Sequence, residues 1–152
     1  MIEYKKAKLD NILNMQKLVF PEVELGIILE RNDDELATNI RSYTLAFKDN
    51  ELIAFCALHI HSQSLGEIRS LVVKENYRGK NIGKNLVLKL LDEGKELGLQ
   101  KVLSLTYKQS FFERLDFTEI PKESLPEHKI WADCIKCKHF PICNEVSLIK
   151  NL

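Results

Sequence analysis

A strand, a basic glycine-bearing turn and a long helix follow one another over residues 66–98, in the middle of the chain. The strand ends in the apolar run 71–73, and apolar residues then recur at helical spacing from Gly83 to Leu97. Gly98 predicts the end of that helix, because glycine readily adopts the left-handed C-cap conformation. Such a turn aims backbone N–H groups and the positive end of the helix dipole at one point.

Three cations lie on or beside this turn, Arg78, Lys80 and Lys84, so a phosphate or pyrophosphate is the expected ligand. Only three residues separate Gly79 from Gly83, whereas a P-loop has four between its glycines. A dinucleotide-binding fingerprint is excluded as well, because it needs three glycines after the first strand of a βαβ unit. The alternative to a phosphate site is an ordinary strand-to-helix connection with a solvated basic face.

Length and charge favour one soluble domain over residues 1–152. The 22 basic and 22 acidic residues cancel, which argues against a general nucleic-acid binder. No apolar run approaches the roughly 20 residues that span a bilayer, and Met1–Lys6 begins a strand rather than a signal peptide. We therefore expect a cytoplasmic protein with neither a nucleic-acid nor a membrane partner. The sequence leaves the oligomeric state open, a homodimer included.

Periodicity and turn signals predict the element order β-α-α-β-β-β-α-β-α-β-β. A first strand is expected over residues 2–5, then a helix from Asp10 that Pro21 ends, and a second helix capped by Asp33 or Asp34. Further strands are expected over residues 43–48, 51–60, 66–73, 101–106, 117–120 and 146–152. The Asp49-Asn50 turn follows the first of these strands, and a short helix starts at Ser110. An irregular Cys-containing segment, 121–144, precedes the last strand.

The turn resembles the coenzyme A loop of the GNAT N-acetyltransferases, Arg/Gln-x-x-Gly-x-Gly/Ala. Residues 78–83 match it except at Asn81, where the family prefers Gly; Asn keeps the N–H and tolerates a positive φ. Residues 111–117 resemble the family motif Phe-Phe/Tyr-Glu-x-x-Gly-Phe, with Asp116 at the usual Gly. The element order is also that of a GNAT domain. This resemblance implies an α/β (α+β) fold, the acyl-CoA N-acyltransferase fold, with a mixed central sheet and helices on both faces.

The resemblance also implies acetyl-CoA (coenzyme A) as cofactor. The residues assigned to it are Leu71, Val72, Val73, Arg78, Gly79, Lys80, Asn81, Ile82, Gly83, Lys84 and Phe112.

Further segments are similar to the short, single-domain N-acetylglutamate synthases and their relatives. They are residues 28–31, 35–36, 39–41, 56–59, 67–71, 105–107 and the stretch 129–145, with Glu30 where Pro is usual. This similarity implies transfer of acetyl to the α-amine of an amino acid, L-glutamate first, by direct attack on the thioester, the first step of arginine biosynthesis. Relatives with altered acceptors keep most of these segments.

Acetyl transfer to an amine needs a proton acceptor, a donor to the oxyanion and an acid for the leaving thiolate. Glu67, at the start of a largely apolar strand, is the expected general base through a water, with an exposed strand-end charge as the alternative. The N–H of Val72 or Val73 is the expected oxyanion donor. Strict alternation predicts two faces of the strand, one with Glu67, Arg69 and Leu71 and the other with Ile68, Ser70 and Val72.

The general acid of the wider superfamily is often the Tyr of Phe-Tyr-Glu. Here Phe112 stands at that position, and its side chain cannot donate a proton. Ser110 and Tyr107 are the candidates, and Ser110 is favoured at its helix start, although it can also be a plain N-cap.

An acceptor with two carboxylates calls for arginines, which pair with carboxylates bidentately. Arg31, Arg41 and Arg69 are the candidates, each otherwise a surface charge or ion-pair partner, and Thr106 lies in a matched segment. His59 and His61, near a strand end, are interpreted as core or rim residues.

Three cysteines gather near the C-terminus, Cys134, Cys137 and Cys143, with His139 between them. They suffice for a tetrahedral zinc site; reduced packed thiols and a redox pair are the alternatives, and a structural disulfide is disfavoured in a reducing cytoplasm. Cys56 is expected in the core.

Other functions fit the same residues. One is acetylation of another small amine or a peptide N-terminus, although the arginines favour an anionic acceptor. Another is a catalytically degenerate module that binds coenzyme A, which Phe112, Asn81 and Asp116 permit.

Overall fold

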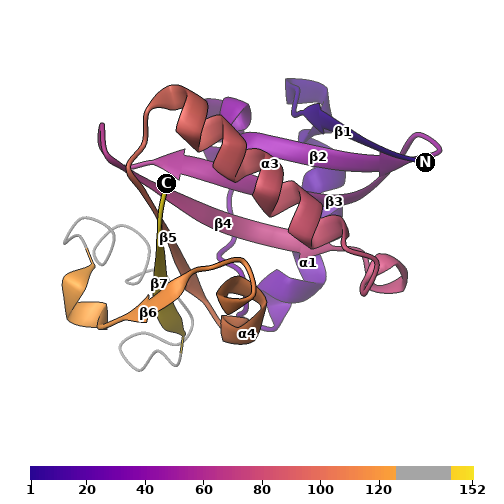
Figure 1. Cartoon of the computed structure of the whole chain (residues 1–152). Coiled ribbons are helices and arrows are strands. Elements are labelled where there is room, and N and C mark those ends of the chain that lie inside the picture. Colours follow the sequence, from indigo (N-terminus) through magenta and orange to yellow (C-terminus); the bar gives the residue numbers. More distant parts are fainter. Residues whose placement is uncertain (126–144) are drawn as a thin grey trace.

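A seven-stranded sheet runs through the described part of the chain, with strand order β1-β2-β3-β4-β5-β7-β6 (Figure 1). The computed structural model describes residues 1–125 and 145–152. The strands β4 and β5 pair in parallel, and the other neighbours pair antiparallel. The strands are β1 (Ile2–Lys6), β2 (Tyr43–Lys48), β3 (Glu51–Ile60), β4 (Leu65–Val73), β5 (Lys101–Thr106), β6 (Thr118–Ile120) and β7 (Val146–Asn151).

Helices cover both faces of this sheet. Helix α3 (Ile82–Leu97) crosses one face, where its apolar stripe packs on β2, β3 and β4 (Figure 1). Helix α1 (Ile12–Glu24) lies on the opposite face against β3 and β4, beside α2 (Asp33–Thr38). The short α4 (Gln109–Glu113) packs near β6 and β7. Single 3₁₀ turns are η1 (Leu9–Asn11), η2 (Ile40–Ser42), η3 (Glu75–Tyr77) and η4 (Lys122–Ser124).

Two hydrophobic cores result, one on each face of the sheet. The α3-side core holds Leu86 and Leu90, neither of which is solvent-exposed. The α1-side core holds Met15, Leu45 and Phe55. The predicted mixed sheet with helices on both faces is therefore confirmed. Within the described ranges, none of the helices combines the length and apolarity that a bilayer crossing requires.

Local turn chemistry explains the best-predicted boundaries. Asp49 and Asn50 have φ of 50° and 66°, as the tight turn of a hairpin requires, and the flanking strands have the predicted bounds. Gly98 ends α3 at φ 94°, and its N–H donates to the carbonyl of Gly94. The strand at 101–106 also has its predicted bounds.

Two helix predictions on the α1 side were wrong. Pro21 does not end α1, which continues through it to Glu24. The last turn is retained because the N–H of Leu25 reaches the Pro21 carbonyl and Val23 is buried. The cap of α2 is Asn32 rather than either aspartate, because its Oδ1 accepts the Glu35 N–H at 2.9 Å and the Glu35 carboxylate accepts the Asn32 N–H in return.

The short helix near residue 110 also differs from its prediction. It begins at Gln109, with Lys108 at the cap position, so Ser110 is its second residue and not its N-cap.

We expect Asn32→Ala to lower the free energy of unfolding by about 1 kcal/mol, because it removes the side-chain acceptor of the α2 capping box. Asn32→Asp keeps an acceptor oxygen and serves as the matched control. Urea denaturation of both variants measures the difference, and equal stability of Ala and Asp would show that the cap contributes nothing.

Candidate active site

The two central parallel strands separate part-way along their length. The ladder between β4 and β5 runs from the pair Leu65–Lys101 to the pair Ile68–Ser104. Beyond that pair β4 continues to Val73 and β5 to Thr106. The last five residues of β4 therefore lie beyond the end of the parallel ladder, which leaves main-chain groups on that edge for a ligand.

A β-bulge changes the faces of β4. Phe55 pairs with Val72 and Ala57 with Arg69, so β4 has one residue more than β3 between these pairs. Ser70 takes up the extra length at φ 58°, a left-handed conformation that is uncommon for a non-glycine residue. The structure thus supplies a bulge that strict alternation did not predict.

The predicted face assignment fails beyond this bulge. Glu67 and Arg69 do share a face, as their ion-pair contact shows. Leu71, however, packs with Val73 against the α3-side core, whereas Val72 lies in the α1-side core. The extra residue therefore moves Leu71 away from the face of Glu67.

Cys56 lies beneath the bulge, on β3. Its thiol contacts the Arg69 carbonyl at 3.6 Å and no part of the residue is exposed, as expected for a core cysteine. Burial in these surroundings raises the pKa of the Cys56 thiol to about 12.

The main chain of Val73 faces away from β3. The N–H of Lys74 donates to Ile53 of β3 at 2.7 Å. Because alternate amides of a strand point the same way, the N–H of Val72 also points to β3 and that of Val73 points to the opposite side. The Val73 carbonyl lies on that side too, where it accepts Arg78 Nε at 2.9 Å.

The turn before α3 has the geometry of an anion site. Gly79 and Asn81 have φ of 78° and 65°, so Asn81 adopts the conformation for which the family prefers glycine. The first intrahelical bond joins the Asn85 N–H to the Asn81 carbonyl at 3.0 Å, which leaves the N–H groups of residues 82–84 at the open end of the helix. This arrangement fits a phosphate-bearing ligand. Lys80 lies beside it, with its ammonium 5.6 Å from the Tyr77 ring centroid.

The Arg78 side chain makes its contacts with β4 and α1. Besides its bond to Val73, its guanidinium contacts Glu22 Oε1 of α1 at 2.5 Å. The side chain therefore connects β4 with α1. Gly83 has ordinary space around it, since an added Cβ would lie 3.6 Å from Val73 Cγ2.

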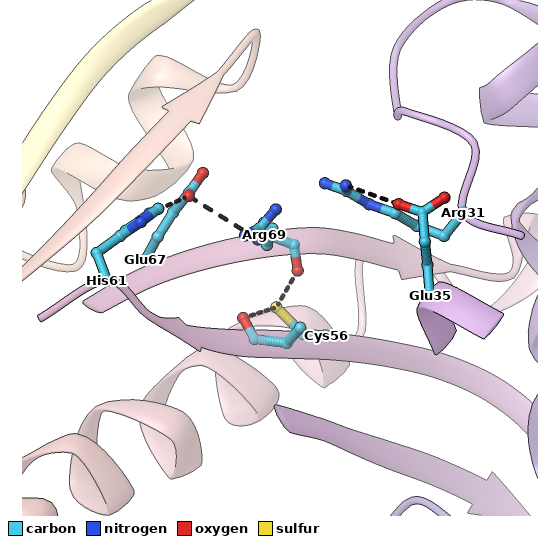
Figure 2. A network of polar contacts seen from close by, with 7 residues as sticks. Arg31, Glu35, Cys56, His61, Glu67 and Arg69 are labelled. Atoms are coloured by element: carbon cyan, nitrogen blue, oxygen red, sulfur yellow. Dashed lines mark hydrogen bonds and ion pairs between the residues drawn. The ribbon is translucent and has the colours of Figure 1, made fainter. Parts of the chain in front are cut away.

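Glu67 is buried, with only 1% of its surface exposed, so the alternative of an exposed strand-end charge was wrong. His61 Nε2 lies 2.8 Å from Glu67 Oε1, and Arg69 Nε lies 3.9 Å from the same oxygen. Figure 2 shows the two side chains on either side of the carboxylate. A buried carboxylate with such partners is a candidate proton acceptor.

A pocket lies beside this carboxylate. It is partly open to solvent and is lined by Arg31, Asn39, Ser42, Tyr43, Ala57, His59 and Arg69. The Arg31 and Arg69 side chains are each 15% exposed, and Arg31 also contacts Glu35 at 3.6 Å. In Figure 2 the guanidinium of Arg31 points from the loop before α2 toward Arg69.

Tyr43 contributes a buried hydroxyl to the same pocket. Burial raises the pKa of the Tyr43 phenol, an effect that the charges of Arg31 and Arg69 and the hydrogen bond with Ser70 partly oppose. The pocket is thus closely surrounded by positive charge.

The remaining predicted residues are more scattered. Arg41 is exposed on η2 and does not line the pocket. Tyr107, which is 40% exposed, and the exposed Ser110 both follow β5. Thr106 Oγ1 accepts the Lys108 N–H at 2.9 Å. Phe112 is buried between the Phe111 and Phe117 rings, in the core.

The three predicted zinc ligands, Cys134, Cys137 and Cys143, lie outside the described residues. Within residues 1–125 and 145–152, no group of three or more His, Cys, Asp or Glu side chains is arranged to hold a metal ion.

The bulged strand β4 and the turn before α3 both lie in a region that matches a known protein family. The model of the Acetyltransferase (GNAT) family matches residues 9–117, most of the chain, including the bulged strand and the turn before α3. The chain belongs to the GNAT family. An uncharacterised N-acetyltransferase of Chlorobaculum tepidum is 38% identical to this GNAT chain over 127 residues, which cover 84% of the chain and 81% of the relative.

Longer proteins that are similar to this GNAT chain have names that refer to the acetylation of amino acids. The amino-acid acetyltransferase of an Enterobacter species is 28% identical over 129 residues, 84% of this chain and 29% of that protein. The solved N-acetylglutamate synthase of Neisseria gonorrhoeae, complexed with coenzyme A and N-acetyl-glutamate, has a TM-score of 0.87 at 22% identity and covers 100% of this chain and 35% of that chain. This structural likeness shows the fold, and the chain spans well under half of both proteins.

His61 is the contact that sequence reasoning missed. The sequence places it six residues before Glu67, beyond the end of β3, and only the hairpin between β3 and β4 brings the two together. Two histidines two residues apart at the end of one predicted strand, with a carboxylate at the start of the next, are the signal that could have found it.

Ser70→Val is expected to lower the free energy of unfolding by about 1–2 kcal/mol more than Ser70→Gly. Both variants lose the hydroxyl that bonds Tyr43, but only valine is strained at the left-handed φ of the bulge. Chemical denaturation of the two variants gives the difference. If valine matches glycine, the bulge is not held in this conformation.

Proposed function

We propose that this GNAT domain transfers acetyl from acetyl-CoA to the α-amine of an amino acid that carries a side-chain carboxylate, with L-glutamate first among the candidates. The observation that carries the proposal is the meeting of Arg31 and Arg69 in one pocket beside the buried Glu67. The amino-acid acetyltransferase and N-acetylglutamate synthase names of its relatives support the same acceptor class.

The pocket suits carboxylates because the described residues that line it include two guanidinium groups and no acidic side chain. Arg31 comes from the loop after α1 and Arg69 from β4, and each also contacts a carboxylate outside the lining, Glu35 and Glu67 respectively. A guanidinium that is 85% buried holds a carboxylate more strongly than one in water, since the surroundings screen the charges less. A polyamine would bring further positive charge into this pocket, so it is a poor acceptor.

The turn before α3 is the proposed coenzyme A site. The N–H groups of residues 82–84 would hold the pyrophosphate, with Lys80 and Lys84 adding charge. Arg78 would act differently from the sequence expectation, because its contacts hold Val73 and Glu22.

In the proposed reaction, the acceptor nitrogen attacks the thioester carbonyl carbon, the C–N bond forms and the C–S bond breaks. Glu67 takes the amine proton through a water. The Val73 N–H donates to the developing oxyanion, since it points away from β3. Tyr107 or Ser110 protonates the leaving thiolate and regains that proton from the nitrogen of the tetrahedral intermediate, which loses its second proton as the amide forms.

The departures from family pattern do not favour a degenerate module. Asn81 and Asp116 stand where glycine is usual, and both have left-handed φ, 65° and 69°. The backbone therefore keeps the family's conformation at both positions. Phe112 removes a superfamily proton donor, but Tyr107 and Ser110 remain nearby in the chain.

With acetyl-CoA, we expect turnover of glutamate and similar acidic amino acids to exceed that of their uncharged analogues and of spermidine. A thiol-release assay over this panel measures it. A clear rate with an uncharged amine and none with glutamate would transfer the assignment to that acceptor.

Arg69→Gln should raise the KM for the acidic acceptor about 10- to 100-fold, because a hydrogen bond to a charged group contributes about 1.5–3 kcal/mol. The KM for acetyl-CoA should change little. Arg114→Gln, on the exposed end of α4, is the matched control. An unchanged acceptor KM in Arg69→Gln would remove this residue from the substrate site.

Glu67→Gln should lower kcat about 10²- to 10⁴-fold, the range that general-base catalysis contributes. Coenzyme A binding, followed by calorimetry, should be retained, because the α3 turn is untouched. Turnover equal to the wild type would end the general-base assignment, whereas binding without turnover in the wild type itself would identify a coenzyme A sensor.

A further inference from the structure

We propose that His61 acts through Glu67 as the second member of a buried carboxylate–imidazole pair, which receives the proton that the attacking amine releases and passes it toward solvent. This inference rests on the proposed function, in which Glu67 is the base. The contact that carries it is the 2.8 Å approach of His61 Nε2 to Glu67 Oε1 (Figure 2).

Burial makes such a partner necessary. The Glu67 side chain is 2% exposed and that of His61 is 4% exposed, so the carboxylate has almost no direct contact with bulk water. Each acetylation of an ammonium acceptor delivers a proton to Glu67, and that proton must leave before the next turnover. His61 is the imidazole within hydrogen-bond distance of the carboxylate, and imidazole exchanges protons readily near neutral pH.

The hairpin gives this route a short exit. His61 directly follows β3, and its N–H bonds the Leu65 carbonyl at 2.9 Å, which closes the turn onto β4. The next three residues, 62–64, are exposed. An exposed turn thus begins directly after His61.

The proton balance is simple. The acceptor ammonium loses one proton through water to a Glu67 carboxylate oxygen. The carboxylic acid gives that proton to Nε2 of neutral His61, and the imidazolium releases its Nδ1 proton through the 4% of the side chain that is exposed to solvent. Glu67 returns to the carboxylate and His61 to a neutral ring, so only N–H and O–H bonds have changed and no other reactant is needed.

Further polar side chains face the pair. Arg69 Nε lies 3.9 Å from the Glu67 oxygen that His61 approaches, so the carboxylate lies between an imidazole and a guanidinium. His59 faces the pair from β3, with 4.8 Å between its ring centroid and that of His61, and it is also the cross-strand partner of Glu67. Arg31 faces the site from across the pocket.

A purely structural role for His61 predicts a different result. If the ring only holds Glu67 in place, an amide N–H that donates to the same oxygen should replace it. His61→Gln keeps such a donor but cannot take up a proton. This variant therefore separates holding from proton transfer.

The experiment measures kcat and both KM values from acid to alkaline pH for wild type, His61→Gln and His61→Ala, with Gln63→Ala in the exposed turn as control. We expect kcat of His61→Gln to fall about tenfold or more, with both KM values retained. The acid limb of its profile should move to lower pH, because the proton then rests on a carboxylate alone. Added imidazole should restore part of the His61→Ala rate and leave Gln63→Ala unaffected.

A His61→Gln kcat within twofold of wild type and an unmoved acid limb would overturn the proposal. Thermal melting and coenzyme A binding check that the variants fold; if His61→Ala does not, the profile of His61→Gln decides. The wild-type rates test the proposed function, and the variant ratio, taken with whichever acceptor is fastest, tests His61. A wild type inactive with every acceptor would refute both.

Discussion

The short parallel ladder between β4 and β5 is the constraint on which the rest of the site depends. It joins four residue pairs and stops at Ile68 and Ser104, while both strands continue. The end of β4 thereby keeps a free edge inside the protein. The β-bulge acts on the same stretch, because its extra residue at Ser70 turns Val72 toward the α1-side core. Strand separation and bulge thus both act on β4, the strand that also supplies Arg69 to the pocket.

Largely buried side chains of opposite charge surround the pocket between Arg31 and Arg69. Glu67 is held between an imidazole and a guanidinium, and Arg31 approaches from the opposite side with its own carboxylate partner. In water such contacts would contribute little, but burial strengthens each of them and makes an unpaired member costly. The same burial that would strengthen the proposed binding of a carboxylate restricts how protons enter and leave the site.

Much of this architecture was predictable from sequence where local chemistry decides the outcome. The Asp49-Asn50 hairpin, the Gly98 cap and the left-handed tolerance of Asn81 follow from properties of single residues. The bulge at Ser70 was not predictable, because it depends on register against β3 rather than on the residue itself. Pro21 was misjudged for a similar reason, since burial of Val23 keeps the helix going beyond it. The sequence named Arg31 and Arg69, which do meet in the pocket, but also Arg41, which does not line it; the His61 contact with Glu67 exists only through the hairpin.

The protonated thiol of Cys56 has a consequence for the chemical route. A thioester donor bound along the end of β4 would lie one strand away from this cysteine, and thiolates exchange acyl groups with thioesters. With its pKa raised to about 12, Cys56 stays a thiol at any pH at which amines are acetylated, and it is fully enclosed. Cys56 therefore offers no acyl-enzyme route to the acetyl transfer proposed above.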